Sequence, residues 1–191
     1  MKRREAVTGL AVIIGGSMVG SSLFLTSCKT EEKKQAGGPV ALTADDVALL
    51  DEVAETIIPT TDTPGAKAAG VGAFMKVMVT DCYTDDDQKV FIEGITKLGE
   101  ASHKQFSKGF MDLDAGQKKT LLTALDKEMK DYQASKKDTD PKHYFKMMKD
   151  LTVQGYFTSE IGATKALRYV AVPGKFEGCM PYKKGDKAWA T

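Results

Sequence analysis

The side chains with the most versatile chemistry in this 191-residue sequence are three cysteines and two histidines. His103 and His143 have no second ligand at a spacing that suits a metal ion, and no Cys-x-x-Cys-His haem-attachment motif occurs. The glycine-rich turn of a dinucleotide site and the Gly-x-Ser-x-Gly turn of a hydrolase are also missing. Carboxylates are plentiful, but nothing selects a pair for acid–base catalysis. The sequence therefore predicts no catalytic, cofactor-binding or metal-binding residues in this chain.

Three adjacent aspartates, Asp85, Asp86 and Asp87, form the densest group of oxygen ligands. A calcium loop needs ligands at alternating positions and a closing glutamate, and this stretch has neither. Thr84 precedes the aspartates, and an apolar stripe with helical spacing follows them. Hydroxyl caps and first-turn carboxylates are typical of helix starts. We therefore interpret this cluster as the beginning of a helix.

Cys28 ends an N-terminal segment that has the layout of an export signal. Residues 2–4 are basic, residues 6–25 are uncharged and mostly apolar or small, and the segment closes on Leu-Thr-Ser-Cys. These four residues match the bacterial lipobox, whose cysteine is acylated and becomes the first residue of the mature protein. We predict a lipoprotein signal peptide over residues 1–28, with Cys28 as the lipidation site. An uncleaved membrane anchor is the alternative, since a span needs about 20 residues.

The basic start contains Arg3 and Arg4, a pair that permits export by the twin-arginine route, which carries folded cargo. The expected location is the periplasmic side of a bacterial membrane, with a lipid anchor. Lys29 after the cysteine favours the outer membrane under an enterobacterial-type sorting rule. Residues 29–40 are charged and then glycine-rich, which is typical of a flexible tether.

Charge and length limit what the mature chain can be. The whole chain has a formal charge of +1, and removal of three basic residues and one acidic residue with the signal leaves about −1. That balance argues against nucleic acid as a partner, which would require a concentrated basic face. Residues 41–191 have a length that suits one domain with its own core.

The pattern of apolar residues predicts an all-α domain of about five helices with an irregular C-terminal tail. No sustained alternation or hairpin turn indicates a strand. The first expected helix starts after Thr43 and ends at Pro59, the second spans residues 66–80, and the third spans residues 85–106 with a possible break at Gly99. The fourth opens at Asp114 and reaches the polar stretch 136–140, and the fifth begins at Asp140-Pro141. A short turn is expected near residues 159–169.

Cys82 and Cys179 remain once Cys28 is assigned to the lipid. An even pair in an exported chain predicts one disulfide, which would tie the tail to the middle of the domain. Two free thiols are the alternative, because unpaired cysteine behaves as a small apolar residue.

Two stretches resemble the gluconate 2-dehydrogenase subunit 3 family. Residues 55–66, Glu-Thr-Ile-Ile-Pro-Thr-Thr-Asp-Thr-Pro-Gly-Ala, followed by Ala-Gly-Val at 69–71, are similar to its first conserved block. Residues 155–162, Gly-Tyr-Phe-Thr-Ser-Glu-Ile-Gly, with Pro-Gly at 173–174 and Gly-Cys at 178–179, are similar to its last block. The resemblance spans roughly residues 41–182, which is nearly the whole mature chain.

The resemblance implies a small helical subunit of a membrane-associated sugar or polyol dehydrogenase, an oxidoreductase that acts on CH–OH groups. Its partner would be a large flavoprotein of the glucose-methanol-choline type that holds FAD, and a multihaem cytochrome c often completes such complexes. The small subunit would aid folding and export of the flavoprotein. The lipobox at Cys28 departs from the family pattern by giving this chain its own anchor. The family pattern supplies no catalytic residues.

The contact surface for such a partner is expected in the loop after the first helix and in the aromatic tail. The expected contact residues are Thr60, Asp62, Pro64, Gly65, Tyr156, Phe157 and Trp189. Tyr156, Phe157, Tyr169 and Phe176 could instead cover the domain's own helices. At the level of function, the alternative is a free-standing envelope lipoprotein that binds a ligand or assists assembly.

Overall fold

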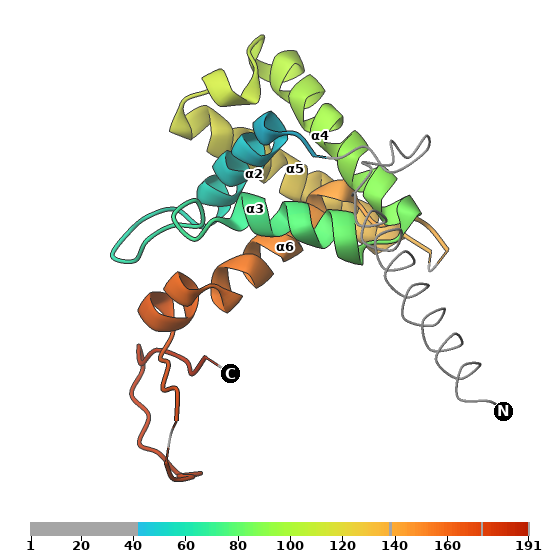
Figure 1. The fold of residues 1–191 in the computed structure, drawn as a ribbon. Coiled ribbons are helices and arrows are strands. Elements are labelled where there is room, and N and C mark those ends of the chain that lie inside the picture. The colour runs from blue at the N-terminus through green and yellow to red at the C-terminus, as the bar shows by residue number, and fades with distance from the viewer. Residues whose placement is uncertain (1–41, 138, 173, 191) are drawn as a thin grey trace, which may run out of the picture. The chain divides into compact units, whose positions relative to one another are not determined.

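The computed structural model describes residues 42–137, 139–172 and 174–190, and in these residues the prediction of an all-α fold is confirmed (Figure 1). Within these ranges the chain forms five α-helices and no strand. They are α2 (Ala44–Ile57), α3 (Val71–Val77), α4 (Asp85–Phe106), α5 (Ala115–Ser135) and α6 (Tyr144–Thr158), with short π-helical segments η2 (Met78–Cys82) and η4 (Gly162–Ala166) and the 3-10 turn η3 (Phe110–Asp112). The predicted signal and tether, with Arg3, Arg4 and Cys28, lie outside the described residues.

Local capping explains where the long helices begin. Thr43 and Asp114 each form a capping box with the residue three positions later, and these boxes start α2 and α5. Thr84 accepts a hydrogen bond from the backbone N–H of Asp87 and caps α4, so the three aspartates occupy its first turn. Their carboxylates lie where the helix dipole stabilises negative charge. The interpretation of this cluster as a helix start is therefore confirmed.

Two helix starts differ from prediction. The second helix begins at Val71 rather than Ala66, because Gly70 adopts the left-handed conformation, with φ of 67°, and interrupts the helical path. The fifth begins at Tyr144 rather than at Pro141, because the His143 side chain serves as its cap. The third helix continues through Gly99 to Phe106 without a break.

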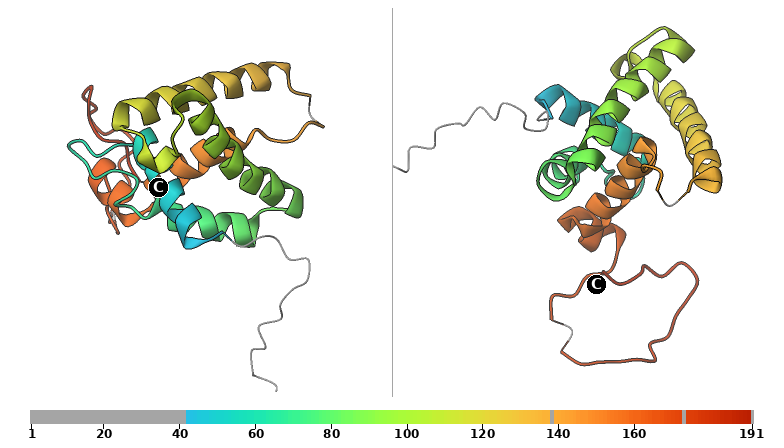
Figure 2. Two further views of the ribbon diagram at one scale, coloured as in Figure 1. Left: turned by 90° about the horizontal axis from the view of Figure 1, so that it is seen from above. Right: turned by 90° about the vertical axis from the view of Figure 1, so that its right-hand side faces the viewer.

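Helix α6 lies at the centre of the domain and contacts α2, α3, α4 and α5 (Figures 1 and 2). Its apolar residues are buried on more than one face, as expected for a helix that is surrounded by other helices. The buried residues of α6 are Tyr144, Phe145, Met147, Met148, Leu151, Thr152, Gly155 and Tyr156. Thr152 satisfies its hydroxyl by donating to the Met148 carbonyl oxygen at 2.7 Å. The remaining helices therefore take their positions from α6.

Close approach between α4 and α6 depends on Gly94. A Cβ atom at this position would lie 2.4 Å from the Cβ of Tyr144, which is far inside contact distance. Tyr144 Cβ is fixed to the α6 backbone, so relief would require the two helices to separate. At Gly99, in the same helix, an added Cβ would meet nothing within 4 Å.

We expect Gly94→Ala and Gly99→Ala to change stability in opposite directions. Overpacking at Gly94 should cost about 1–3 kcal/mol, less the gain of up to about 1 kcal/mol that alanine brings to any helix interior. Gly99→Ala should stabilise by about 0.5–1 kcal/mol from helix propensity alone. Urea denaturation of both variants measures the difference. Equal shifts of the same sign would contradict the close approach of the two helices.

His143 caps α6 with a ring nitrogen. Nδ1 accepts a hydrogen bond from the Phe145 backbone N–H at 3.2 Å, so this nitrogen must be unprotonated. Nε2 lies 3.9 Å from the Glu128 Oε1 atom. Burial disfavours the imidazolium and lowers the pKa of His143, although the Glu128 carboxylate acts in the opposite direction. The cap therefore operates with neutral histidine.

Domain stability should fall as the pH drops below about 6.5, the ordinary histidine value. The unfolded state gains the His143 proton at higher pH than the native state does, so the free energy of unfolding decreases until the pH passes the lowered native pKa. His143→Asn keeps a good cap but cannot titrate, so this part of the pH dependence should disappear. Urea denaturation between about pH 5 and pH 7.5, with His103→Asn as the control, measures it. An unchanged slope in His143→Asn would contradict this assignment.

Candidate partner interface

The loop between α2 and α3, residues 58–70, is organised by the carboxylate of Glu55. Its Oε1 atom accepts hydrogen bonds from the Thr60 backbone N–H at 2.9 Å and from the Thr60 hydroxyl at 2.8 Å. Its Oε2 atom accepts from the Lys67 backbone N–H at 2.9 Å. Thr60 Oγ1 in turn accepts from the Gly65 N–H at 3.0 Å. One side chain at the end of α2 thus fixes both arms of the loop.

The Pro64-Gly65 step brings the loop onto the helices. A Cβ at Gly65 would lie 2.3 Å from the Glu55 carboxylate, so only glycine leaves room for it. The Tyr156 hydroxyl donates to the Pro64 carbonyl oxygen at 2.7 Å, and the Ala66 N–H donates to the Ile58 carbonyl oxygen at 3.0 Å. The base of the loop is therefore fixed, whereas Pro59–Asp62 at its tip are exposed.

Two glutamates, Glu55 and Glu52, place negative charge next to the donors of this loop. Burial raises the pKa of Glu55, but the hydrogen bonds from Lys67 and Thr60 outweigh it and leave the pKa below its ordinary value. Glu52 pairs with Lys67 of the loop and, at 2.9 Å, with Lys118 of α5. The hydrogen bonds from these two lysines lower the pKa of Glu52. Both carboxylates are therefore ionised at neutral pH and hold the loop against α2 and α5.

A second exposed feature is the segment of residues 168–190, which we call the C-terminal arm. It leaves the helices after η4, extends outward and returns (Figure 2). The Arg168 N–H donates to the Ala188 carbonyl oxygen at 2.8 Å, and the Ala190 N–H donates to the Arg168 carbonyl oxygen at 2.9 Å. The Arg168 guanidinium also lies 3.9 Å from the centre of the Trp189 ring. These contacts close the two ends of the arm on each other.

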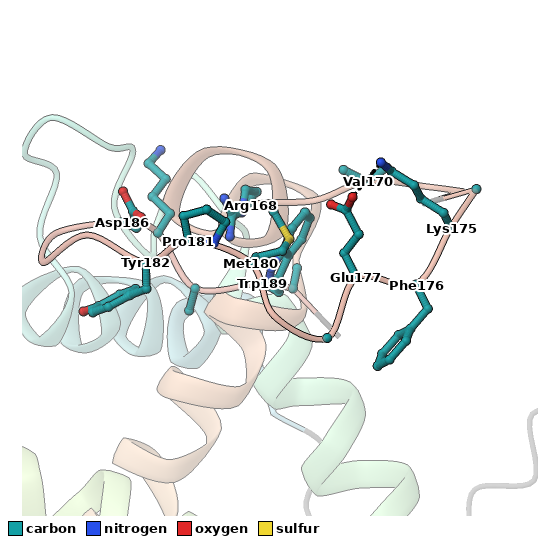
Figure 3. Close-up of a pocket in the computed structure, with 15 residues that line it drawn as sticks. Arg168, Val170, Lys175, Phe176, Glu177, Met180, Pro181, Tyr182, Asp186 and Trp189 are labelled. Carbon is teal, nitrogen blue, oxygen red and sulfur yellow. Dashed lines mark hydrogen bonds and ion pairs between the residues drawn. The ribbon is translucent and has the colours of Figure 1, made fainter.

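Every described residue between the two ends of the arm, 169–172 and 174–189, is exposed. The arm surrounds a hollow of about 1130 Å³, and Phe176, Tyr182 and Trp189 are among the residues that line it (Figure 3). The large apolar side chains exposed on the arm are Tyr169, Val170, Val172, Phe176, Met180, Tyr182 and Trp189. Monomeric proteins rarely expose so many neighbouring apolar side chains, and such patches commonly mark interaction sites.

The loop residues of the predicted contact surface divide between tip and base. Thr60 and Asp62 are exposed at the tip, Pro64 is half-buried, and Gly65 is buried against Glu55. The structure thus leaves the two tip residues open to a partner. Pro64 and Gly65 instead shape the loop that presents them.

The aromatic residues of the predicted surface also divide. Phe157 and Trp189 are 39% and 42% exposed, but Tyr156 is only 2% exposed. The inclusion of Tyr156 among the contact residues is therefore corrected, because this ring lies in the core and its hydroxyl supports the loop. Tyr156 therefore covers the domain's own helices, whereas Phe157, Tyr169 and Phe176 remain exposed.

The predicted disulfide is absent from the structure, where Cys82 and Cys179 are both free and exposed. Lys142, just before α6, pairs with Asp87 at 2.7 Å, which places the start of α6 near Cys82. The arm that carries Cys179 follows the other end of α6, about 22 Å away for a helix of 15 residues. A disulfide requires Cα atoms within about 7 Å. Cys82 thus lies near the start of α6, whereas the arm that carries Cys179 begins after the end of this helix.

Sequence reasoning did not assign roles to Glu55 and Arg168. Glu55 bonds to Lys67, which is 12 positions away, and Arg168 stacks on Trp189, which is 21 positions away. Neither spacing belongs to a helix or a tight turn, so no local pattern marks these pairs. The run Thr-Thr-Asp-Thr-Pro-Gly at 60–65 signals a structured turn but not the side chain that organises it.

Within the described residues, no three His, Cys, Asp or Glu side chains come together as metal ligands. No helix in the same part of the chain combines the length and apolar character needed to cross a bilayer.

Comparison with protein families matches residues 44–174 to gluconate 2-dehydrogenase subunit 3. The match covers helices α2 to α6, the loop at residues 58–70 and the beginning of the C-terminal arm. Comparisons with curated proteins and with solved structures gave no significant match. With more than half of its residues matched, the chain belongs to the gluconate 2-dehydrogenase subunit 3 family.

Proposed function

We propose that this chain is a non-catalytic accessory subunit of an FAD-dependent sugar or polyol dehydrogenase. Its partner is a catalytic subunit of the glucose-methanol-choline type, which holds FAD, with a cytochrome c as an optional third subunit. Family membership is the observation that carries the proposal. The loop and the C-terminal arm support it, because both expose side chains on a backbone that is already folded.

The chain assists its partner by binding it before or during export. A twin-arginine signal containing Arg3 and Arg4 carries a folded, FAD-loaded partner across the membrane together with this chain. Acylation of Cys28 then keeps the complex at the periplasmic side of the membrane. A loop held by Glu55 needs little ordering on contact, and pre-ordering reduces the entropic cost of association.

Purification from the native membrane in mild detergent tests the proposal. We expect the chain to co-elute with a flavoprotein that shows FAD absorbance and oxidises a sugar or polyol. Elution of the chain alone, with the flavoprotein elsewhere in the gradient, would refute the accessory role and favour a free-standing lipoprotein. Replacement of Cys28 by serine should release the complex into the soluble fraction without dissociating it.

A further inference from the structure

We infer that the C-terminal arm is the element that docks the FAD-containing subunit, and that it binds an acidic surface with an apolar centre. This inference rests on the proposed function and specifies which part of the chain makes the contact. The family match ends at residue 174, so residues 175–190 of the arm lie beyond it. Exposure, charge and one unpartnered side chain carry it.

The exposure of the arm is the first observation. Phe176 is 96% exposed, and Tyr182 and Val172 are nearly as open. These side chains stand on a backbone that is closed by the Arg168–Trp189 contacts and turned at Gly174 and Gly185, which both have positive φ. The arm therefore presents its apolar side chains in a defined conformation. Aromatic side chains of this kind are the usual anchors of protein interfaces.

Charge identifies the chemistry of the occupant. Residues 42–161 carry 21 acidic and 15 basic side chains, a net charge of −6, whereas residues 162–191 carry six basic and two acidic side chains, a net charge of +4. The arm's two carboxylates already have donors, because Glu177 pairs with Lys175 and Asp186 accepts from the Lys183 N–H. Lys183 and Lys184 have no ion pair among the described residues. A complementary surface must therefore supply carboxylates.

Arg168 points to the same chemistry. Its Nε atom is buried and has no hydrogen-bond partner in the part of the chain that the structure describes. The guanidinium is held over the Trp189 ring and borders the hollow of the arm. A guanidinium presents a planar fork of donors that matches a carboxylate. A carboxylate of the partner that enters the hollow would pair with the guanidinium of Arg168, which lines it.

The occupant is a protein surface rather than the chain's own body. The helical body of this chain is acidic, yet residues 169–189 of the arm, where described, do not fold back onto it and remain exposed. An acidic surface alone is thus insufficient to bind the arm, and the partner must also complement its aromatic side chains. The dehydrogenase subunit implied by the family is the macromolecule that this chain is expected to bind.

The test compares arm variants with matched variants on the helical body, in the full-length lipoprotein produced with its dehydrogenase. The apolar arm variant is Phe176→Ser with Tyr182→Ser, and its control is Val77→Ser with Met111→Ser, which are 55% and 48% exposed on the body. The charge variant is Lys183→Glu with Lys184→Glu, and its control is Lys119→Glu with Lys127→Glu on α5. The readouts are the ratio of FAD to this chain after purification and the melting temperature of the isolated chain.

Each arm variant should reduce the affinity for the flavoprotein about tenfold or more at unchanged melting temperature, whereas the controls should retain it. Loss in the charge variant should also be reproduced in the wild type by raising the salt concentration. If both arm variants retain the flavoprotein as well as the wild type does, the inference is wrong and the proposed function stands. If the wild type itself elutes without flavoprotein, both fail.

Two further measurements address other occupants of the arm. In the first, the Cys28→Ser chain is mixed with vesicles of anionic phosphatidylglycerol and its binding is measured. In the second, the mass of the same chain without vesicles is measured by light scattering. Vesicle binding that requires the arm, with the flavoprotein retained by the arm variants, would assign the arm to a lipid surface and overturn the inference. A dimer that dissociates in the arm variants would assign it to a second copy, with the same consequence.

Discussion

Replacement of Tyr156 by alanine is expected to lower the free energy of unfolding by about 3–5 kcal/mol, the range for deletion of a buried aromatic ring. The ring is 2% exposed at the centre of the core, and its hydroxyl donates to the Pro64 carbonyl oxygen at 2.7 Å. The substitution leaves a cavity beneath the loop and removes the only side-chain donor recorded for that carbonyl among the described residues. Urea denaturation followed by circular dichroism measures the loss.

Two controls separate the ring from its hydroxyl and from its neighbours. Tyr156→Phe keeps the ring and should cost about 1 kcal/mol, the net value of one hydrogen bond. Phe157→Ala removes an adjacent ring that is 39% exposed, and it should cost no more than about 1.5 kcal/mol, including the edge-to-face contact with Tyr156. A loss in Phe157→Ala as large as that in Tyr156→Ala would contradict the assignment of Tyr156 to the core.

Glu55→Ala should destabilise the domain by about 2–3 kcal/mol, because three donors of the loop lose their acceptor at once. The loop tip is exposed, so water replaces part of what is lost, and we place the cost below the sum for three buried groups. Hydrogen exchange should show faster exchange at the Thr60 and Lys67 amides. Glu55→Gln retains one acceptor oxygen and should show an intermediate effect.

The Glu55 contribution should also depend on pH. The native pKa lies below the ordinary value near 4.5, so the stabilisation is complete above that pH and is lost as the pH falls through the native pKa. Glu55→Ala lacks this part of the acid dependence. Glu93→Ala is a matched control, because this glutamate is exposed on α4 with Lys97 at 3.7 Å and should contribute within about 0.5 kcal/mol. Equal effects of the two substitutions would show that Glu55 does not organise the loop.

Substitutions of Glu55 and of Asp62 bear on function, because the first changes the shape of the loop and the second changes a residue at its tip. If the loop is a docking surface, Glu55→Ala weakens partner binding through disorder, whereas substitution of Asp62 at the exposed tip weakens it without a change in stability. A comparison of the two in the co-purification experiment distinguishes a structural role of the loop from a direct contact.

The sequence by itself determined the helices and most of their limits. Thr43, Thr84 and Asp114 were recognisable as caps because their hydrogen bonds reach only three residues along the chain. The apolar spacing within each helix likewise depends only on the period of the helix, so the all-α class followed from pattern alone. The family resemblance, carried by residues 55–71 and by the late glycine-rich stretch, needed no coordinates either.

Only the tertiary structure decided which residues these helices bring together. Tyr156 belongs to the core because α6 passes through the centre of the domain, and Cys82 and Cys179 are both free and exposed. Contacts between residues far apart in the chain depend on how whole helices pack, and the spacing of residue types along the chain does not encode them. For the same reason, the exposure of the C-terminal arm followed from the packing of the helices and not from its composition.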